Sequence, residues 1–514
     1  MFTTVNSAAV YGLQAYPVRV EVDLAGGLPS FQMVGSLGSE VKESRERVCV
    51  AMKNSGFQVP PAHITVNLAP AGRRKDGTAF DLPIAVGLLR DMELLKEEML
   101  QNTLFLGELG LNGEIKKVKG VLPIVQEAVK QGIQRVVVPG ENAMEAAVIP
   151  GITVWGVKNL KDLLSVLSHP EKENENVYKP RIRAEDLLKE ANGQELGDFR
   201  EVAGQENAKR GAEIAAAGFH NLLMMGPPGV GKSMIAGRIP GILPPLTLEE
   251  SLEVTGIFSV AGLLPPGQAL ITRRPFYAPH HTVTQAALIG GGSGIPRPGM
   301  VSLAHRGVLF LDELPEFQKV VLDGMRQPME EHKVQIARSA GMVTYPSDFI
   351  LVAAMNPCPC GYYPDRNKCR CTQPQIEKYL GKISGPILDR IDLCVELHPV
   401  DILHLQKGRR QKSSKDMKRR ILGARERQEK RFEGTDCRFN GDIRSALVEQ
   451  YCPLGAEERK VMEQLYNTLQ LSARAYHRIL KTARTIADLE EQEEITGEHL
   501  LEAACYRPSE TYWN

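Results

Sequence analysis

The stretch that decides the fold of this 514-residue chain runs from position 226 to position 233 and reads Gly226-Pro227-Pro228-Gly229-Val230-Gly231-Lys232-Ser233. It matches the phosphate-binding pattern G-x-x-x-x-G-K-[ST] at every fixed position, between a strand-like apolar run at 221–225 and a helix-like run at 234–238. Glycines let backbone N–H groups close around phosphate oxygens, and the following helix N-terminus adds positive potential. We expect Lys232 to neutralise the terminal phosphates and Ser233 to offer its hydroxyl to Mg²⁺. The stretch predicts an α/β domain that binds and hydrolyses a nucleotide; the alternative is a glycine-rich turn that matches by chance.

A second acidic element follows an apolar run at 308–311, which predicts a buried parallel strand. Asp312 and Glu313 come directly after this strand, at the end where ligands bind in open α/β sheets. We expect Asp312 to act on Mg²⁺ and Glu313 to polarise the attacking water. An Asp-Glu pair after a strand is common, but together with the phosphate-binding loop it predicts an ATPase.

Further polar residues resemble the sensors of AAA+ ATPases. The apolar run 349–355 ends in Asn356, which resembles the first sensor and is expected to hydrogen-bond the attacking water or the terminal phosphate. The segment 385–392 resembles the one that projects an arginine finger into a neighbouring subunit, which makes Arg390 the candidate; a surface salt bridge with Asp389 or Asp392 is the alternative. The segment 471–478 resembles the second sensor, with Arg474 as the better match and Arg478 in reserve. An arginine that acts on a neighbour implies a homo-oligomer, expected to be a hexameric ring.

Four further strings are more specific than the phosphate-binding loop: 201–206 with 208–210, 278–282, 302–305 and 312–317. With these strings the chain resembles Mg-chelatase-like AAA+ proteins of the ComM/YifB type over nearly all of its length. The resemblance implies ATP and Mg²⁺ as cofactors and a ring motor on single-stranded or branched DNA, as in branch migration during recombination or natural transformation. Met300 departs from the family pattern, where an acidic residue is expected after Arg297-Pro298-Gly299. The alternatives are the motor subunit of a metal-chelatase complex and a nucleotide-gated scaffold that remodels a protein partner.

The region between these motifs contains candidate DNA contacts. Residues around 250–300 are interpreted as an insertion that is glycine-rich at 290–294, and 333–345 predicts a strand, a tight turn and a strand. This hairpin resembles the one before the first sensor in DNA-translocating relatives. Lys333 and Arg338 are then expected to contact DNA phosphates, with a plain solvated hairpin as the alternative.

The N-terminal block, residues 1–167, alternates strand-like and helix-like runs and predicts a separate α/β domain. The strings 75–79, 107–114 and 132–139 resemble the proteolytic domain of Lon, a module also found attached to RadA. Lon-type hydrolysis needs a serine and a lysine, but the corresponding positions hold Ala79 and Leu122. We therefore expect no peptidase activity and a role in building the ring or binding DNA. The charged face at 42–48 is one candidate for that role, with a plain solvated face as the alternative.

The remaining organisation follows from composition. Residues 168–197 are interpreted as a linker that is solvated over 168–183, 198–400 as the AAA+ core, and 401–514 as a helical lid. Four cysteines in C-x-C pairs, Cys358, Cys360, Cys369 and Cys371, predict a structural Zn²⁺ site, with unligated thiols as the alternative. Twelve Lys/Arg between 407 and 431 suit either a DNA backbone or a solvated connector.

Bulk properties set limits on location and partners. The net charge is zero, so any basic surface must be local. No signal peptide is evident, and no apolar stretch approaches the roughly 18 residues that cross a bilayer, so we expect a cytoplasmic protein without a membrane partner.

Overall fold

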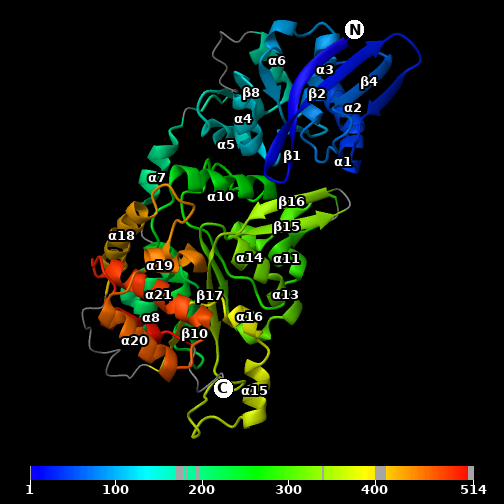
Figure 1. Cartoon of the computed structure of the whole chain (residues 1–514). Coiled ribbons are helices and arrows are strands. Elements are labelled where there is room, and N and C mark those ends of the chain that lie inside the picture. The colour runs from blue at the N-terminus through cyan, green and yellow to red at the C-terminus, as the bar shows by residue number, and fades with distance from the viewer. Residues whose placement is uncertain are drawn as a thin grey trace.

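Two β-sheets and a helical C-terminal region make up the computed structural model, which describes residues 2–168, 178–180, 182–192, 197–292, 294–338, 341–399 and 412–507. The N-terminal sheet lies at one end of the molecule, the second sheet lies in the middle, and the C-terminal helices pack on the flank of the middle part (Figure 1). The predicted fold class is confirmed. Within the described residues, no helix is both long and apolar enough to cross a membrane.

The N-terminal sheet has seven strands in the order β3-β4-β2-β1-β5-β8-β9. Its long β1–β2 hairpin is antiparallel, and β2 alternates buried and exposed residues because one face packs against helices. The strands are β1 Phe2–Tyr11, β2 Gln14–Ala25, β3 Ser30–Val34, β4 His63–Ala69, β5 Thr103–Phe105, β8 Arg135–Pro139 and β9 Thr153–Val157, with a small hairpin of β6 Glu108–Leu109 and β7 Ile115–Lys116. The helices are α1 Ser39–Lys42, α2 Ser44–Asn54, α3 Asp81–Asp91, α4 Val121–Lys130, α5 Ala143–Ala147 and α6 Leu160–Ser168.

The central sheet is parallel, with five strands in the order β11-β14-β17-β10-β18. The three middle strands are apolar and buried throughout, because helices cover both faces of a parallel sheet. The strands are β10 Leu222–Met225, β11 Phe276–Tyr277, β14 Val308–Leu311, β17 Ile350–Met355 and β18 Leu393–Glu396. The helices of this part are α8 Glu206–Gly218, α9 Lys232–Ile242, α10 Leu248–Ala261, α13 Lys319–Gly324, α14 Arg326–Glu331, α15 Gln373–Leu380 and α16 Gly385–Leu388.

Two small hairpins lie beside this sheet. The predicted hairpin is present as β15 Lys333–Arg338 and β16 Gly341–Pro346, paired from Lys333 opposite Pro346 to Arg338 opposite Gly341. The glycine-rich insertion contributes α11 Gln285–Ile289, β12 Gly290–Gly291, β13 Arg297–Pro298 and α12 Met300–Leu303. The β15–β16 hairpin and the glycine-rich insertion share one buried apolar cluster, to which Ile336 of β15 and Leu288 of α11 contribute.

The C-terminal helices pack on the central sheet through a common buried cluster. They are α18 Ser414–Arg431, α19 Val448–Tyr451, α20 Ala456–Thr468, α21 Ala473–Leu489 and α22 Gly497–Cys505. The second half of the predicted basic run forms α18, where Arg420 pairs with Glu213 and Arg431 with Asp488. These two arginines are therefore paired with buried carboxylates of the protein, while 401–411 lies outside the described residues.

The N-terminal part is joined to the central part by side-chain contacts. Glu145 accepts hydrogen bonds from Leu122 N and Ser259 Oγ, the latter on α10. Burial raises the pKa of the Glu145 carboxyl, although these hydrogen bonds oppose the shift. Leu122 and Ala79 lie in an apolar cluster with Leu252 of α10, so the two positions expected to correspond to a peptidase dyad pack against the central part.

The predicted linker needs one correction. Residues 184–192 form a helix, α7 Ala184–Asn192, whose Leu187 and Leu188 pack against the same cluster. This part of the predicted linker is therefore a packed helix, because two adjacent leucines give it an apolar face.

Candidate active site

The phosphate-binding loop connects the end of β10 to the start of α9. Glycine is required at position 226 because the backbone of Leu397 lies close to it. A Cβ added there would lie 2.5 Å from the carbonyl oxygen of Leu397. Gly231 has a φ of 95° and caps α9, a left-handed conformation that favours glycine. No atom lies within 4 Å of a Cβ added at Gly229 or Gly231, so the loop opens onto free space. This cradle fits a phosphate group at the N-terminus of α9.

Lys232 is folded back onto the loop. Its Nζ donates hydrogen bonds to the carbonyl oxygens of Gly226 and Pro227 and to Asn356 Oδ1, the last at 2.9 Å. Burial lowers the pKa of the Lys232 amine, while the nearby carboxylates of Asp312 and Glu313 oppose the shift. The structure thus brings together side chains that follow three neighbouring strands, β10, β14 and β17.

The acidic pair lies beside the loop. Ser233 Oγ donates a hydrogen bond to Asp312 Oδ2 at 2.8 Å, and the Glu313 backbone N–H donates to Asp312 Oδ1 at 2.9 Å. A hydroxyl and a carboxylate so placed are the oxygen ligands that Mg²⁺ prefers, so the donor set fits this ion. Glu313 has a φ of 53°, a left-handed conformation that costs a non-glycine residue about 1–3 kcal/mol and is typical of functional sites.

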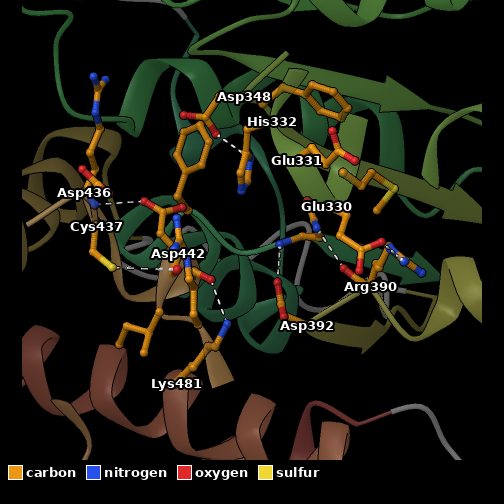
Figure 2. A pocket seen from close by; sticks show the side chains of 18 of the residues that line it. Glu330, Glu331, His332, Asp348, Arg390, Asp392, Asp436, Cys437, Asp442 and Lys481 are labelled. Carbon is orange, nitrogen blue, oxygen red and sulfur yellow. Dashed lines mark hydrogen bonds and ion pairs between the residues drawn. The ribbon is translucent and has the colours of Figure 1, made fainter. Parts of the chain in front are cut away.

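The arginine candidates lie in a different place, around a cavity of about 1370 Å³. Figure 2 shows Arg390 at this cavity together with Glu330, with which it forms an ion pair. Arg474 pairs with Asp389 at 3.0 Å, and Arg478 donates to the carbonyl oxygens of Leu388 and Ile391. The salt bridge considered for Arg390 therefore exists with a partner that the sequence did not indicate, rather than with Asp389 or Asp392.

The phosphate-binding loop and the arginines lie at opposite edges of the central sheet. Asn221, directly before β10, donates hydrogen bonds to Asp392 and to the Arg390 carbonyl oxygen, so Arg390 lies at the amino ends of the strands. The loop follows the carboxyl end of β10, and four strand residues separate the two edges by about 13 Å. Accordingly, no residue of the loop is among those that line the cavity. One chain does not bring its own arginines to its own loop.

The four predicted cysteines form a cluster. Sγ of Cys358 lies 3.3 Å from Sγ of Cys360 and 3.8 Å from Sγ of Cys369, and all four sulfurs lie within 4.8 Å of one another. Tetrahedral Zn²⁺ with bonds of about 2.3 Å sets its sulfurs about 3.8 Å apart, so the cluster fits this ion. The cysteine loop also packs against the phosphate-binding loop, since a Cβ added at Gly361 would lie 2.7 Å from Pro228 Cδ.

One residue at the site was not assigned a role from the sequence. His281 follows β11, and its Nδ1 lies 3.3 Å from Glu313 Oε2. The position of His281 after an apolar segment is a sequence signal that could have identified it. In the structure, β11 pairs in parallel with β14, and polar residues that follow neighbouring parallel strands meet at one edge of the sheet. The predicted DNA contacts, Lys333 and Arg338, are exposed on the β15–β16 hairpin.

Comparisons with known proteins cover most of the chain. Residues 198–405 match the family described as magnesium chelatase, subunit ChlI; residues 20–142 match subunit ChlI of Mg-chelatase; residues 411–507 match the ChlI C-terminal family. YifB of Salmonella typhimurium is 42% identical over 507 residues, covering 98% of this chain and 96% of YifB. The competence protein ComM of Haemophilus influenzae is 40% identical over 513 residues, covering 98% and 97%.

Two further similarities each cover about a third of the chain or less. Lon protease 2 of Bacillus subtilis is 28% identical over 189 residues, 33% of this chain and 34% of that protein. The DNA repair protein RadA of Halalkalibacterium halodurans is 30% identical over 152 residues, 29% of this chain and 33% of RadA.

Proposed function

Because the chain belongs to the Mg-chelatase-like AAA+ family that includes YifB and ComM, we propose that it is an ATP-driven ring motor that acts on DNA. The observation that carries the proposal is that the site is divided between two edges of the central sheet. The phosphate-binding loop and the carboxylates of Asp312 and Glu313 lie at one edge, and Arg390 lies at the other. Such a division suits a ring, in which each subunit presents one edge to the next.

Binding of ATP is assigned to the cradle at 226–233. Lys232 exchanges its contact with Asn356 for the terminal phosphates, and Ser233 and Asp312 hold Mg²⁺. The bound ion supplies positive charge that neutralises the phosphate oxygens. Glu313 orients the attacking water and accepts its proton, while Asn356 hydrogen-bonds the water or the terminal phosphate.

Completion of the site is assigned to a neighbouring subunit. Arg390 and Arg474 line one cavity, and each is held by a carboxylate of its own chain, Glu330 and Asp389 respectively. We assign Arg390 the role of arginine finger and Arg474 that of second sensor, both on the neighbour's nucleotide. A contact between two different faces gives a ring when the rotation between subunits closes, and we propose a closed ring of six subunits.

DNA is proposed as the substrate of the motor. Lys333 and Arg338 are exposed on a hairpin that lies beside the glycine-rich loop, since a Cβ added at Gly291 would lie 3.3 Å from Arg338 Nη2. Exposed cations contact phosphates without regard to base sequence, as a translocating motor requires. The names of two relatives, a competence protein and a DNA repair protein, point the same way, toward recombination or transformation.

Two parts of the chain are proposed to support the motor without taking part in hydrolysis. We assign a structural Zn²⁺ to the cysteine cluster, where it would brace the phosphate-binding loop through the contact of Gly361 with Pro228. The N-terminal part is proposed to lack peptidase activity, because Ala79 has no nucleophile and Leu122 no amine. The N-terminal part contacts α10 through Ser259, and we propose that it serves as a structural part of the ring.

The test is ATP hydrolysis with and without DNA. We expect the wild-type protein with Mg²⁺ to release phosphate faster when single-stranded, duplex or branched DNA is added, and Lys232→Ala to lose hydrolysis. Lys460→Ala, which removes an exposed lysine on α20, is the matched control and should retain the wild-type rate. Hydrolysis unaffected by every DNA would favour the metal-chelatase or protein-remodelling alternatives, and no hydrolysis under any condition would contradict the proposal.

A further inference from the structure

We propose that His332, Asp348 and Asp442 form a binding site for one divalent transition-metal ion, which joins the central part of the chain to the C-terminal helical region. The potential ligand atoms of the three side chains lie within 4.8 Å of one another. Figure 2 shows the three residues next to one another at the cavity that Arg390 also lines. No residue of the phosphate-binding loop lines this cavity, so the inference does not depend on the proposed function.

The three residues come from segments that are distant in the sequence. His332 directly follows α14 and precedes β15, and Asp348 lies between β16 and β17, so these two residues flank the β15–β16 hairpin. Asp442 is the last residue of a short 3₁₀ helix, Asn440–Asp442, which lies between α18 and α19 in the sequence. An ion held by all three side chains would therefore fasten both ends of the hairpin to the C-terminal region.

The spacing of His332 and Asp348 is that of two ligands of one ion. His332 Nδ1 lies 3.1 Å from Asp348 Oδ1, yet this buried oxygen accepts no hydrogen bond of normal geometry within the described residues. A metal ion bonded at about 2.1 Å to nitrogen and oxygen holds neighbouring ligand atoms about 2.9–3.4 Å apart. A buried carboxylate oxygen without a well-aligned donor costs free energy, and a cation bound between the two side chains would satisfy it.

Asp348 is held by contacts that leave Oδ1 directed at His332. Arg306 Nη1 donates a hydrogen bond to the other carboxylate oxygen, Oδ2, and the Arg306 backbone N–H donates to the Asp348 carbonyl oxygen. The Asp348 backbone N–H donates to His305 Nδ1 at 3.0 Å. Outer contacts of this kind orient a ligating carboxylate in metal sites, so Asp348 is fixed before an ion binds.

Asp442 offers the third ligand from the C-terminal region. Its Oδ2 accepts hydrogen bonds from the backbone N–H groups of Arg438 and Phe439, at 3.1 and 2.9 Å. Within the described residues no hydrogen bond reaches Asp442 Oδ1, so this oxygen is available to an ion. A side-chain adjustment of about 1 Å brings ligand atoms up to 4.8 Å apart to the spacing that one ion requires. A divalent cation between the two carboxylates would also offset their mutual repulsion.

The donor set selects the class of ion. One imidazole nitrogen and two carboxylate oxygens suit Zn²⁺ or Mn²⁺, whereas the thiolates of the cysteine cluster select softer ions. The His332 side chain is 48% exposed, so an ion can enter and water can complete its coordination. The alternative is an ion pair between His332 and Asp348 alone, in which Asp442 would take no part.

The experiment titrates the full-length protein with Mn²⁺ in the absence of nucleotide and follows the free ion by electron paramagnetic resonance. Mn²⁺ is the probe because thiolates bind it poorly. We expect the wild-type protein to bind Mn²⁺ at this site, and His332→Gly and Asp442→Asn each to weaken the binding by about 100-fold. Mn²⁺ in 100-fold excess over its Kd should raise the thermal midpoint of the wild-type protein by about 5 °C, and that of neither variant.

Both variants are chosen to preserve the fold. Glycine suits the left-handed backbone at position 332, where φ is 53°. The amide oxygen that Asp442→Asn introduces can still accept the hydrogen bonds from Arg438 and Phe439. The matched controls are Asp436→Asn and His477→Ala, which change residues that line the same cavity outside the cluster and should bind Mn²⁺ as the wild type does.

The outcomes separate this site from the phosphate-binding loop. Asp312→Asn should retain the binding, because Asp312 lies at the other edge of the central sheet. The inference is overturned if the wild-type protein shows no saturable binding, if His332→Gly and Asp442→Asn bind Mn²⁺ as tightly as the wild type, or if only Asp312→Asn loses the ion. None of these results depends on ATP hydrolysis, so failure of the proposed function would be seen separately.

Discussion

Replacement of Arg390 by alanine tests whether one subunit completes the site of the next. Arg390 lies at the amino edge of the central sheet, about 13 Å along β10 from the edge that carries Lys232. An arginine side chain held by Glu330 on its own chain cannot contact the phosphates bound by that chain. We therefore expect Arg390→Ala to retain ATP affinity but to lose about 10³-fold in kcat, as removal of an arginine finger does.

Mixing two inactive proteins gives the quantitative form of this prediction. A working site needs its loop from an Arg390→Ala subunit and its arginine from a Lys232→Ala neighbour. Random 1:1 assembly produces this arrangement at about one site in four, so the mixture should recover about a quarter of the wild-type rate. Neither parent alone should reach that value.

The assay is phosphate release by the mixture, with co-assembly verified by pulling down one tagged parent. A mixture of Arg390→Ala with the double variant Lys232→Ala/Arg390→Ala is the control and should not recover activity. Glu330→Gln removes the partner but keeps the arginine, so it should retain hydrolysis. A co-assembled mixture no faster than its parents, or a fully active Arg390→Ala protein, would refute the assignment.

Three further predictions test the site and its support. Asn356→Ala removes the amide proposed to hydrogen-bond the attacking water or the terminal phosphate, so kcat should fall about 10²-fold with ATP affinity unchanged in a fluorescent-nucleotide titration; an unchanged kcat would exclude a catalytic role. Cys360→Ser should abolish bound zinc in elemental analysis and lower the thermal midpoint, whereas exposed Cys505→Ser should change neither; a zinc-free wild-type protein contradicts the site. Burial favours the neutral form of Glu253, but neighbouring histidine and arginine side chains outweigh it and lower the pKa of its carboxyl to about 2. The ionised carboxylate therefore stabilises the fold above pH 4.5, the ordinary pKa, and this stabilisation is lost as the pH falls toward 2. Glu253→Gln should lower the free energy of unfolding in urea by about 1–2 kcal/mol at neutral pH, and the difference from wild type should shrink between pH 4.5 and 2. A difference that stays constant over this range would contradict the assignment.

The local patterns were predictable from the sequence. Each of β10, β14 and β17 is a short apolar run followed by the residues that carry the chemistry, and carboxyl ends of parallel strands meet at one edge. The cysteine pairs likewise lie close in sequence, so their gathering needs only a bent loop. The resemblance to the ComM/YifB type is confirmed by similarity along nearly the whole chain.

Contacts between distant segments were not predictable in the same way. The pairing of Arg390 with Glu330 depends on how α14 packs beside the segment before β18, which no local periodicity encodes. The contact of His281 with Glu313 depends on strand order, because β11 must lie next to β14. The docking of Ser259 on Glu145 joins two parts of the chain whose relative placement is set by tertiary packing.

Strand displacement from a branched DNA substrate tests the central claim most directly. The account predicts that the wild-type protein separates the labelled strand only when ATP and Mg²⁺ are present and that Lys232→Ala, at equal DNA occupancy, does not. Equal displacement by both proteins, or displacement that proceeds without ATP, would contradict it.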